Sequence, residues 1–159
     1  MQFWYMQLHP GNGWDWTLAK KAWPVKQTLG MLRKYRLIGL GNETQWPNDR
    51  SHCRDRFRES MKIGDIVMCA HGMEYIALVE VVGEAFDNVV EYPIDASDGC
   101  WFGVARKVRI LDCNSRKPQE LFDSRYGQDA SRKGVAVRST LCHWHKNGFI
   151  QFWYNHLKE

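Results

Sequence analysis

The sequence predicts an α+β fold built on a mixed, strongly curved sheet or small barrel, and three observations lead to this prediction. Residues 2–8 alternate in the manner of a strand. Residues 61–86 contain two apolar runs joined by a tight connection, which is typical of an antiparallel hairpin. Apolar residues recur at helical spacing within 48–61 and 150–157. Strands and helices therefore alternate irregularly, as in α+β proteins.

The first predicted element is the strand of residues 2–8, and a helix and a second strand follow it. The strand places Phe3, Tyr5 and Gln7 on one face and Trp4, Met6 and Leu8 on the other. Pro24 can open a helix, because its fixed φ suits the first turn. Val25, Leu29 and Leu32 then follow at helical spacing. The run YRLIGLG at 35–41 indicates a strand that ends in glycines.

The most informative segment is a predicted helix that runs from Asn48 or Asp49 to about Met61. Either of these two residues can cap it through a side-chain oxygen. An apolar stripe and an arginine stripe occupy two of its faces. They are Cys53, Phe57 and Met61, and Arg50, Arg54 and Arg58.

The second half of the chain continues with the hairpin and a further strand, WFGVARKVRIL at 101–111. Residues 112–135 are polar, and we expect them to be irregular apart from a short turn at Glu120–Asp123. Ile150, Trp153 and Leu157 then predict a final helix.

The tetrapeptide QFWY occurs at 2–5 and again at 151–154. The first copy lies in an alternating pattern and the second in a helical one, and no similarity extends beyond seven residues. We therefore exclude a duplication. The pattern places Trp4 and Trp153 in the core. It leaves five of the tryptophans in or next to loops: Trp14, Trp16, Trp46, Trp101 and Trp144.

Length and composition predict one globular domain over residues 1–159. The sequence contains neither an apolar run long enough for a membrane span nor the pattern of a signal peptide. Its 5 cysteines are scattered without CxxC spacing, which is typical of reduced thiols in the cytoplasm. A net charge of +4 permits an anionic partner without requiring one.

Motifs for catalysis and for metal binding are weak. No nucleotide-binding glycine motif, nucleophile elbow or HExxH sequence occurs, so we expect no enzymatic activity and no cofactor. Cys142, His143 and His145 form the densest group of metal-ligand types, with His52–Cys53 as another pair. No second pair matches the spacing of a structural zinc site, so a partly exposed strand or loop explains the cluster and we expect no metal.

Basic and aromatic residues offer a better-supported hypothesis. Arginine and lysine contact phosphates, and tryptophan faces stack on bases. The arginine stripe of 50–58, a second basic group of Arg106, Lys107 and Arg109, and the loop tryptophans can therefore form a nucleic-acid surface. The alternative is a solvated helix face whose arginines are balanced by Asp49, Asp55 and Glu59.

The stretch from Trp46 to Asp87 resembles the EVE domain of the PUA-like superfamily. The similarity lies in a tryptophan loop, a basic helix, the turn Met61–Asp65 and the strand Ile76–Asp87. It covers residues 1 to about 112. Related PUA-like families, including ASCH domains, also have Gly-Asp before a strand. Within the turn, Gly64 permits tight backbone geometry and Asp65 can fix the strand entrance by hydrogen bonding to backbone, so we interpret both as structural.

The resemblance implies a PUA-like pseudo-barrel, with a curved mixed or antiparallel sheet flanked by helices. It further implies a binding module that flips a modified base of DNA into an aromatic cage. In similar readers the base is 5-methylcytosine, a related modified cytosine or N6-methyladenine. Those readers have an aromatic residue after the glycines of the 36–42 stretch, and this chain has Asn42.

The residues expected to form the site fall into two groups. Trp14, Trp16 and Trp46 are the candidate walls of the cage, and Asp15, Asn42 and His71 are the candidate readers of the base edge. Extruding a base costs a few kcal/mol, which stacking on aromatic walls can offset. The candidate phosphate ligands are Arg50, Arg54, Arg58 and Lys62.

The resemblance also implies a biological setting. Similar domains form the N-terminal part of McrB-like restriction GTPases and of some modification-dependent endonucleases. We therefore expect the specificity module of a restriction system, as the N-terminal domain of a longer chain or beside a separate GTPase or nuclease. The alternatives are an RNA-binding PUA-like protein that reads modified RNA, an ASCH-like nucleoside or RNA hydrolase that uses Lys62 or Asp15, and a small-molecule or protein-interaction module.

Overall fold

The computed structural model describes residues 1–8, 24–41, 43, 47–72, 74–88, 100–113, 115–133, 140–143 and 147–159. Within these residues one curled, mixed sheet has seven strands in the order β2-β6-β4-β3-β1-β7, with β5 paired to β6. The strands are β1 (Phe3–Gln7), β2 (Leu37–Leu40), β3 (Ile66–His71), β4 (Glu74–Val81), β5 (Phe86–Asp87), β6 (Val104–Cys113) and β7 (Leu141–His143).

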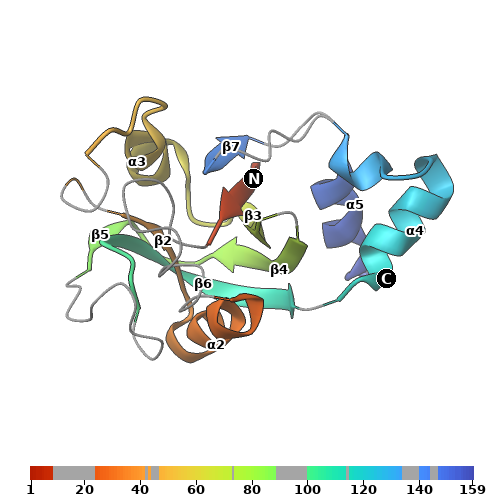
Figure 1. Ribbon diagram of the computed structural model, residues 1–159, viewed down its shortest axis with the longest axis horizontal. Coiled ribbons are helices and arrows are strands. Elements are labelled where there is room, and N and C mark those ends of the chain that lie inside the picture. Colours follow the sequence, from red (N-terminus) through yellow and green to blue (C-terminus); the bar gives the residue numbers. More distant parts are fainter. Residues whose placement is uncertain are drawn as a thin grey trace.

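The sheet is flanked by helices α2 (Val25–Tyr35), α3 (Cys53–Asp55), α4 (Lys117–Tyr126) and α5 (Phe149–His156). Figure 1 shows α2 beside β6, α3 near β5 at the left, and α4 and α5 together at the right. The predicted α+β class with a curved mixed sheet is confirmed, and the architecture is consistent with a PUA-like pseudo-barrel. No helix in the described part of the chain is long and apolar enough to cross a membrane.

Strand pairing confirms the predicted hairpin. β3 and β4 are antiparallel, with Val67 opposite Val79, and they are joined at Gly72, whose φ of 60° suits a residue without a Cβ. β1 lies parallel to β3, with Phe3 opposite Ile66. The carboxyl ends of these two strands therefore meet at the same edge of the sheet.

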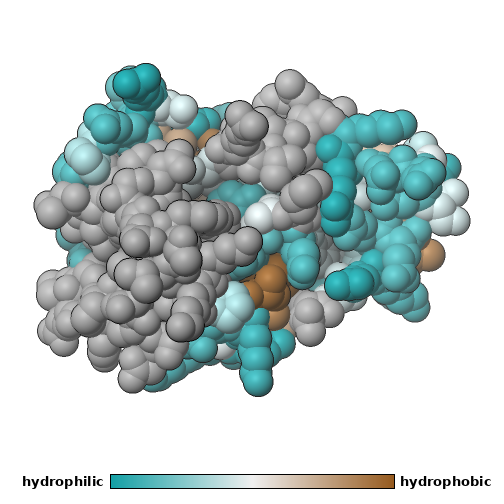
Figure 2. Space-filling view, viewed as in Figure 1, coloured by the Kyte–Doolittle hydropathy of each residue, from teal (hydrophilic) through white to brown (hydrophobic). Residues whose placement is uncertain are grey.

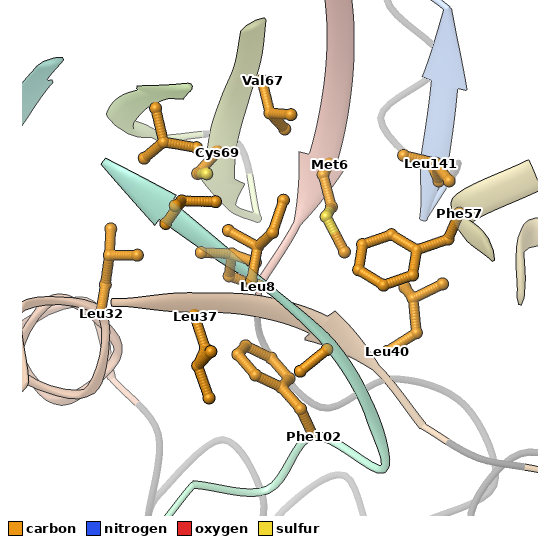
Figure 3. Close-up of a cluster of buried hydrophobic side chains, with 14 of the residues drawn as sticks. Met6, Leu8, Leu32, Leu37, Leu40, Phe57, Val67, Cys69, Phe102 and Leu141 are labelled. Atoms are coloured by element: carbon orange, nitrogen blue, oxygen red, sulfur yellow. The ribbon is translucent and has the colours of Figure 1, made fainter. Parts of the chain in front are cut away.

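Both faces of β1 are buried, because the core has two parts on opposite sides of the sheet. Trp4, Met6 and Leu8 belong to the larger cluster, inside the curl of the sheet, whereas Tyr5 belongs to the smaller cluster beneath α4 and α5. Figure 3 shows Met6 of β1 beside the ring of Phe57, and Leu8, the residue after β1, belongs to the same cluster. The alternation predicted for residues 2–8 is confirmed, as is the core position of Trp4 and Trp153, which are 0% and 1% exposed.

The two copies of QFWY have the two predicted conformations. The first belongs mainly to β1 and the second to α5. Pro24 is the N-cap of α2, and Arg33 and Lys34 lie in its last turn, so the prediction for this helix is confirmed.

The predicted helix over 48–61 is shorter and less regular than expected. The N-cap is His52 and not Asn48 or Asp49, although the Asp49 carboxylate accepts hydrogen bonds from the backbone N–H groups of Cys53 and Arg54 at the start of the helix. The helix begins only at Cys53 and becomes a π-helical turn, η1 (Arg56–Ser60), in which Met61 N–H donates to Arg56 O. His52, with φ 53°, precedes the helix in the left-handed region.

The expectation that residues 112–135 are irregular is wrong, because α4 occupies Lys117–Tyr126. Pro118 stands in its first turn, where a missing N–H costs nothing. Phe122, one turn before Tyr126, packs against Phe149 and Phe152 of α5 at ring-centroid distances of 5.3 and 5.2 Å. A 3-10 turn, η2 (Ala130–Arg132), follows. Tertiary packing therefore stabilises a helix whose own apolar pattern is weak.

Candidate nucleic-acid interface

Five of the predicted base-binding residues lie outside the described residues: Trp14, Asp15, Trp16, Asn42 and Trp46. The sixth, His71, ends β3 and is half-buried. All four predicted phosphate ligands, Arg50, Arg54, Arg58 and Lys62, are described. The structure therefore describes the predicted phosphate ligands and, of the predicted base-binding residues, His71.

The apolar stripe of the α3–η1 segment anchors it to the barrel. Cys53, Phe57 and Met61 are 2%, 0% and 0% exposed and belong to the larger core cluster. Burial of residues of this size contributes roughly 1.5–3 kcal/mol per large side chain. The arginines of the segment are therefore fixed relative to the sheet.

The arginines of this segment differ in their environments. Arg54 is only 8% exposed, and its guanidinium lies 3.5 Å from Gly41 O and 3.7 Å from the Glu43 carboxylate. Arg58 also lies 3.7 Å from Glu43 and pairs with Asp87 at 3.0 Å. Arg54 therefore contacts both Gly41 and Glu43, and Arg58 contacts Glu43, so the two arginines share a carboxylate just after β2.

Arg58 has the properties of a cation that a phosphate can reach. Its side chain is 35% exposed and lines a cavity of about 290 Å³ with Glu84, Phe86 and Asp87. Arg50 and Lys62 are exposed, and no ion pair joins either of them to another described residue. Arg54 is the least accessible of the four predicted ligands.

Asp65 fixes the turn that carries Lys62. Its carboxylate is 2% exposed and accepts hydrogen bonds from Gln2 N–H, Trp4 Nε1 and Lys62 N–H at 2.9, 3.0 and 2.9 Å. Gly64, at φ 94°, supplies the tight backbone geometry. The structural interpretation of these two residues is confirmed.

Arg106 holds the other side of the π-helical turn. Its guanidinium donates to Phe57 O, Arg58 O and Met61 O at 2.9, 3.0 and 2.8 Å, and to Gly83 O at 3.0 Å. A cation suits this place because carbonyl oxygens at the end of a helix carry partial negative charge. Burial lowers the pKa of Arg106, and the negative charges of Glu84 and Asp65 oppose that shift.

The position of Arg106 corrects the predicted second basic surface. Arg106 is 1% exposed, so it cannot contact a phosphate, whereas its neighbours Lys107 and Arg109 are exposed. Arg109 is paired with Glu80. Sequence patterning failed here because the partners of Arg106 are backbone carbonyls 23 to 49 positions away. One sequence signal could have indicated that Arg106 is buried. Side chains alternate along a strand, so Arg106 lies on the same face as the apolar Val104 and Val108.

The carboxyl ends of β1 and β3 form the described edge of the predicted base site. The Gln7 side chain accepts from Gly72 N–H at 2.9 Å and donates to Gly72 O at 2.8 Å. Leu8 N–H donates to Ala70 O at 2.9 Å. The end of β1 is therefore fixed beside the end of β3, next to His71.

His71 lies far from the phosphate candidates along β3. Lys62 precedes the start of this strand, and His71 ends it. Five residue steps of about 3.3 Å separate Ile66 from His71, or roughly 17 Å along the strand. The structure thus brings Arg54 and Arg58 together and leaves His71 at the opposite end.

Of the predicted metal-ligand cluster, His145 lies outside the described residues, whereas Cys142 and His143 are described. Both lie on β7, where the ring of His143 contacts Trp4 with centroids 3.8 Å apart and planes tilted by 40°. Cys53 is buried, and its sulfur accepts a hydrogen bond from Arg56. Among the described residues, no group of three or more His, Cys, Asp or Glu side chains is placed to hold a metal ion.

Comparisons with known proteins find similar structures but no family. No protein-family model matches the chain, and no curated protein matches it in sequence. A hypothetical protein from Leishmania major has a TM-score of 0.49 at 13% identity, over 99% of this chain and 95% of the other. Human THYN1 protein in complex with 5-methylcytosine containing DNA has a TM-score of 0.45 at 14% identity, over 100% and 99%.

A protein from Agrobacterium tumefaciens also has a TM-score of 0.45 at 14% identity, over 98% of this chain and 92% of the other. At these identities and TM-scores, the similarities carry no conclusion about what this chain binds.

Proposed function

We propose that this chain is an EVE-type, PUA-like module that recognises a modified base in DNA by flipping it into an aromatic cage. One observation carries the proposal. Arg54 contacts Gly41 and Glu43, and Arg58 contacts Glu43, so two predicted phosphate ligands lie beside the described residues that flank Asn42 in the sequence. A base reader needs this proximity, because backbone contacts position the strand from which the base is extruded.

In this proposal, the two ends of β3 contact different parts of the DNA. Arg58 and the exposed Arg50 and Lys62 contact the phosphate backbone near its start, and His71 reads the base edge at its far end. The strand β3 alone rises by roughly 17 Å, which is the length of about five nucleotides at 3.4 Å per step of one strand. Contacts at both ends therefore fit one stretch of duplex.

Selectivity in this proposal comes from the base edge more than from the methyl group. Burying one methyl contributes only about 0.8 kcal/mol, which is less than tenfold in affinity. Trp14, Trp16 and Trp46 provide the stacking energy that offsets base extrusion. Asp15, Asn42 and His71 then discriminate 5-methylcytosine, a related modified cytosine or N6-methyladenine through hydrogen bonds that an unmodified or wrong base leaves unpaired.

The module has no catalytic activity of its own in this proposal. It is the specificity module of a modification-dependent restriction system in the cytoplasm, similar to the N-terminal domain of McrB-like GTPases. Cleavage or translocation is supplied by a GTPase or nuclease that is fused to it or bound by it.

The test is direct binding to matched fluorescent duplexes at fixed salt. The duplexes carry no modification, 5-methylcytosine, 5-hydroxymethylcytosine or N6-methyladenine, and single-stranded RNA is the competitor. We expect a preference of about tenfold or more for one modified duplex. Trp14→Ala, Trp16→Ala and Trp46→Ala should abolish the preference, whereas Lys117→Gln, on the distant helix α4, should not.

Two results would overturn the proposal. Equal, salt-sensitive binding to all duplexes would indicate backbone binding alone. Binding that single-stranded RNA competes away at equimolar concentration would indicate a reader of RNA instead.

A further inference from the structure

A cavity of about 560 Å³ lies in the C-terminal helical part of the molecule, away from the candidate nucleic-acid interface. Its volume falls in the range of about 300–1,000 Å³ that is typical of small-molecule sites. It is formed between α4, η2 and the start of α5. Its lining residues are Phe122, Tyr126, Ala130, Lys133, Asn147, Gly148 and Phe152.

Three aromatic rings form the walls of this cavity. Phe122 packs against Tyr126 and Phe152 at centroid distances of 4.6 and 5.2 Å, and so holds the two rings on either side of it. Phe122 is 5% exposed, whereas Tyr126 is 55% exposed. Figure 2 shows a mostly hydrophilic surface over α4 and α5, in which Tyr126 is more exposed than Leu121 and Leu157, the other large apolar side chains exposed in this part.

Asn147 hydrogen-bonds the backbone on both sides of the cavity. Its side-chain amide donates to Ala130 O, Ser131 O and Lys133 O, and its oxygen accepts from Phe149 N–H. These contacts tie η2 to the start of α5. At Gly148, a Cβ would meet no atom within 4 Å, so open space adjoins the backbone there.

Among the described residues that line the cavity, Lys133 is the one cation. Asn147 Nδ2 and Oδ1 are already engaged with backbone, so Lys133 Nζ and the hydroxyl of Tyr126 are the polar groups that can contact a ligand. No ion pair joins Lys133 to another described residue, and no Asp or Glu is among the described residues that line the space. Aromatic walls beside one unneutralised ammonium group favour a flat ring that carries a negative charge.

We propose that this cavity binds an aromatic anion of nucleotide size, with its ring against Tyr126 and Phe152 and its carboxylate or phosphate on Lys133 Nζ. The site is separate from DNA recognition and does not depend on it. A nucleoside monophosphate and an aromatic carboxylate share this chemistry, and the probes below distinguish these two sources.

The experiment is calorimetric and saturation-transfer NMR titration of the full chain with two matched pairs of probes. Adenosine monophosphate is compared with adenosine, and indole-3-acetate with indole. We expect saturable binding of at least one anion, about fivefold or more tighter than its neutral partner. Tighter binding of adenosine monophosphate would identify a nucleotide site, and tighter binding of indole-3-acetate would identify an aromatic carboxylate site.

Variants assign the binding to the cavity. Lys133→Gln should remove the preference for the anion and leave the neutral probe unchanged. Tyr126→Ala should weaken both probes by roughly tenfold, because stacking is lost. Lys117→Gln, which replaces an exposed lysine of α4 outside the cavity, is the matched control and should change neither. Tyr126 and Lys133 are exposed, so neither substitution should prevent folding.

Four results would overturn the proposal. The first three are absence of saturable binding by all four probes at millimolar concentration, equal binding of anions and neutral partners, and binding that Lys133→Gln and Tyr126→Ala leave unchanged. Displacement of the probe by an unmodified duplex would also contradict a separate site. None of these results bears on the preference for a modified duplex, so failure here and failure of the proposed function are distinguishable.

Discussion

The two ends of β3 are fixed by different chemistry. At the start of the strand, buried charges hold the backbone, since Asp65 accepts three hydrogen bonds and Arg106 donates four. At the far end, the neutral amide of Gln7 binds both backbone groups of Gly72. A charged framework therefore supports the segment that carries Arg58, and a neutral one supports the edge that carries His71. Substitutions at the two ends should accordingly differ in size and kind.

The largest effect is expected at the charged end. Arg106→Met leaves four buried or half-buried carbonyls without their donor. We expect a loss of about 3–5 kcal/mol in the free energy of unfolding, or failure to fold. Urea denaturation measures it, with Lys107→Met on the same strand as the exposed control. A loss below about 1 kcal/mol would show that the carbonyls find other partners and that the charged framework is dispensable.

A smaller effect is expected at the neutral end. Gln7→Leu keeps the volume of this side chain, which is 6% exposed, but leaves Gly72 N–H and C=O unpaired. The free energy of unfolding should fall by about 1–3 kcal/mol, by the same amount at low and high salt. A marked salt dependence of this loss would contradict the contrast between the two ends.

The ion pair between Arg58 and Asp87 allows a test of the predicted phosphate contact. Asp87→Asn removes the nearer of the two carboxylates that pair with Arg58, at 3.0 Å, and leaves Glu43 at 3.7 Å. We expect all duplexes to bind about two- to fivefold more tightly at low salt. Asp55→Asn removes an equal charge from the neighbouring helix without touching Arg58 and serves as the control. Equal gains in both variants would mean that net charge alone is responsible.

The last test concerns the pH dependence of stability and Tyr5, whose hydroxyl accepts a hydrogen bond from Gln7. Burial raises its pKa from 10.0 to about 12. As the pH rises from 10 to 12, the unfolded chain loses this proton before the folded chain does, so stability should decline across that window. Tyr5→Phe should reduce the decline, as followed by urea midpoints. Burial also raises the pKa of Tyr75, so some decline should remain. An unchanged slope in Tyr5→Phe would contradict the assignment.

The sequence predicted those parts of the fold in which local pattern and tertiary packing agree. The strand of residues 2–8, the helix after Pro24 and the β3–β4 hairpin have clear periodicity, and each is present. The helix α4 was missed because its packing face depends mainly on Phe122, whose partners lie on α5. The π-helical turn was missed because the arginine spacing of four residues suggested a regular α-helix.

The candidate site could be predicted only in part, for a physical reason. Residue type indicates that an arginine can bind phosphate, but exposure and pairing are decided by distant parts of the chain. Arg58 meets Asp87, which is 29 positions away, and Arg54 is covered where it reaches Gly41. The sequence predicted that Arg106 is a surface cation, but Arg106 is buried and hydrogen-bonds the backbone of the segment that carries Arg58.

The central claim is that backbone affinity and base selectivity reside at opposite ends of β3. The most direct measurement compares His71→Ala with Arg58→Gln in binding to a preferred modified duplex and its unmodified counterpart across a salt series. We expect Arg58→Gln to weaken both duplexes equally and to reduce the salt slope by about 1. His71→Ala should reduce the ratio between the duplexes and leave the slope unchanged. A ratio that falls in Arg58→Gln but persists in His71→Ala would contradict the claim.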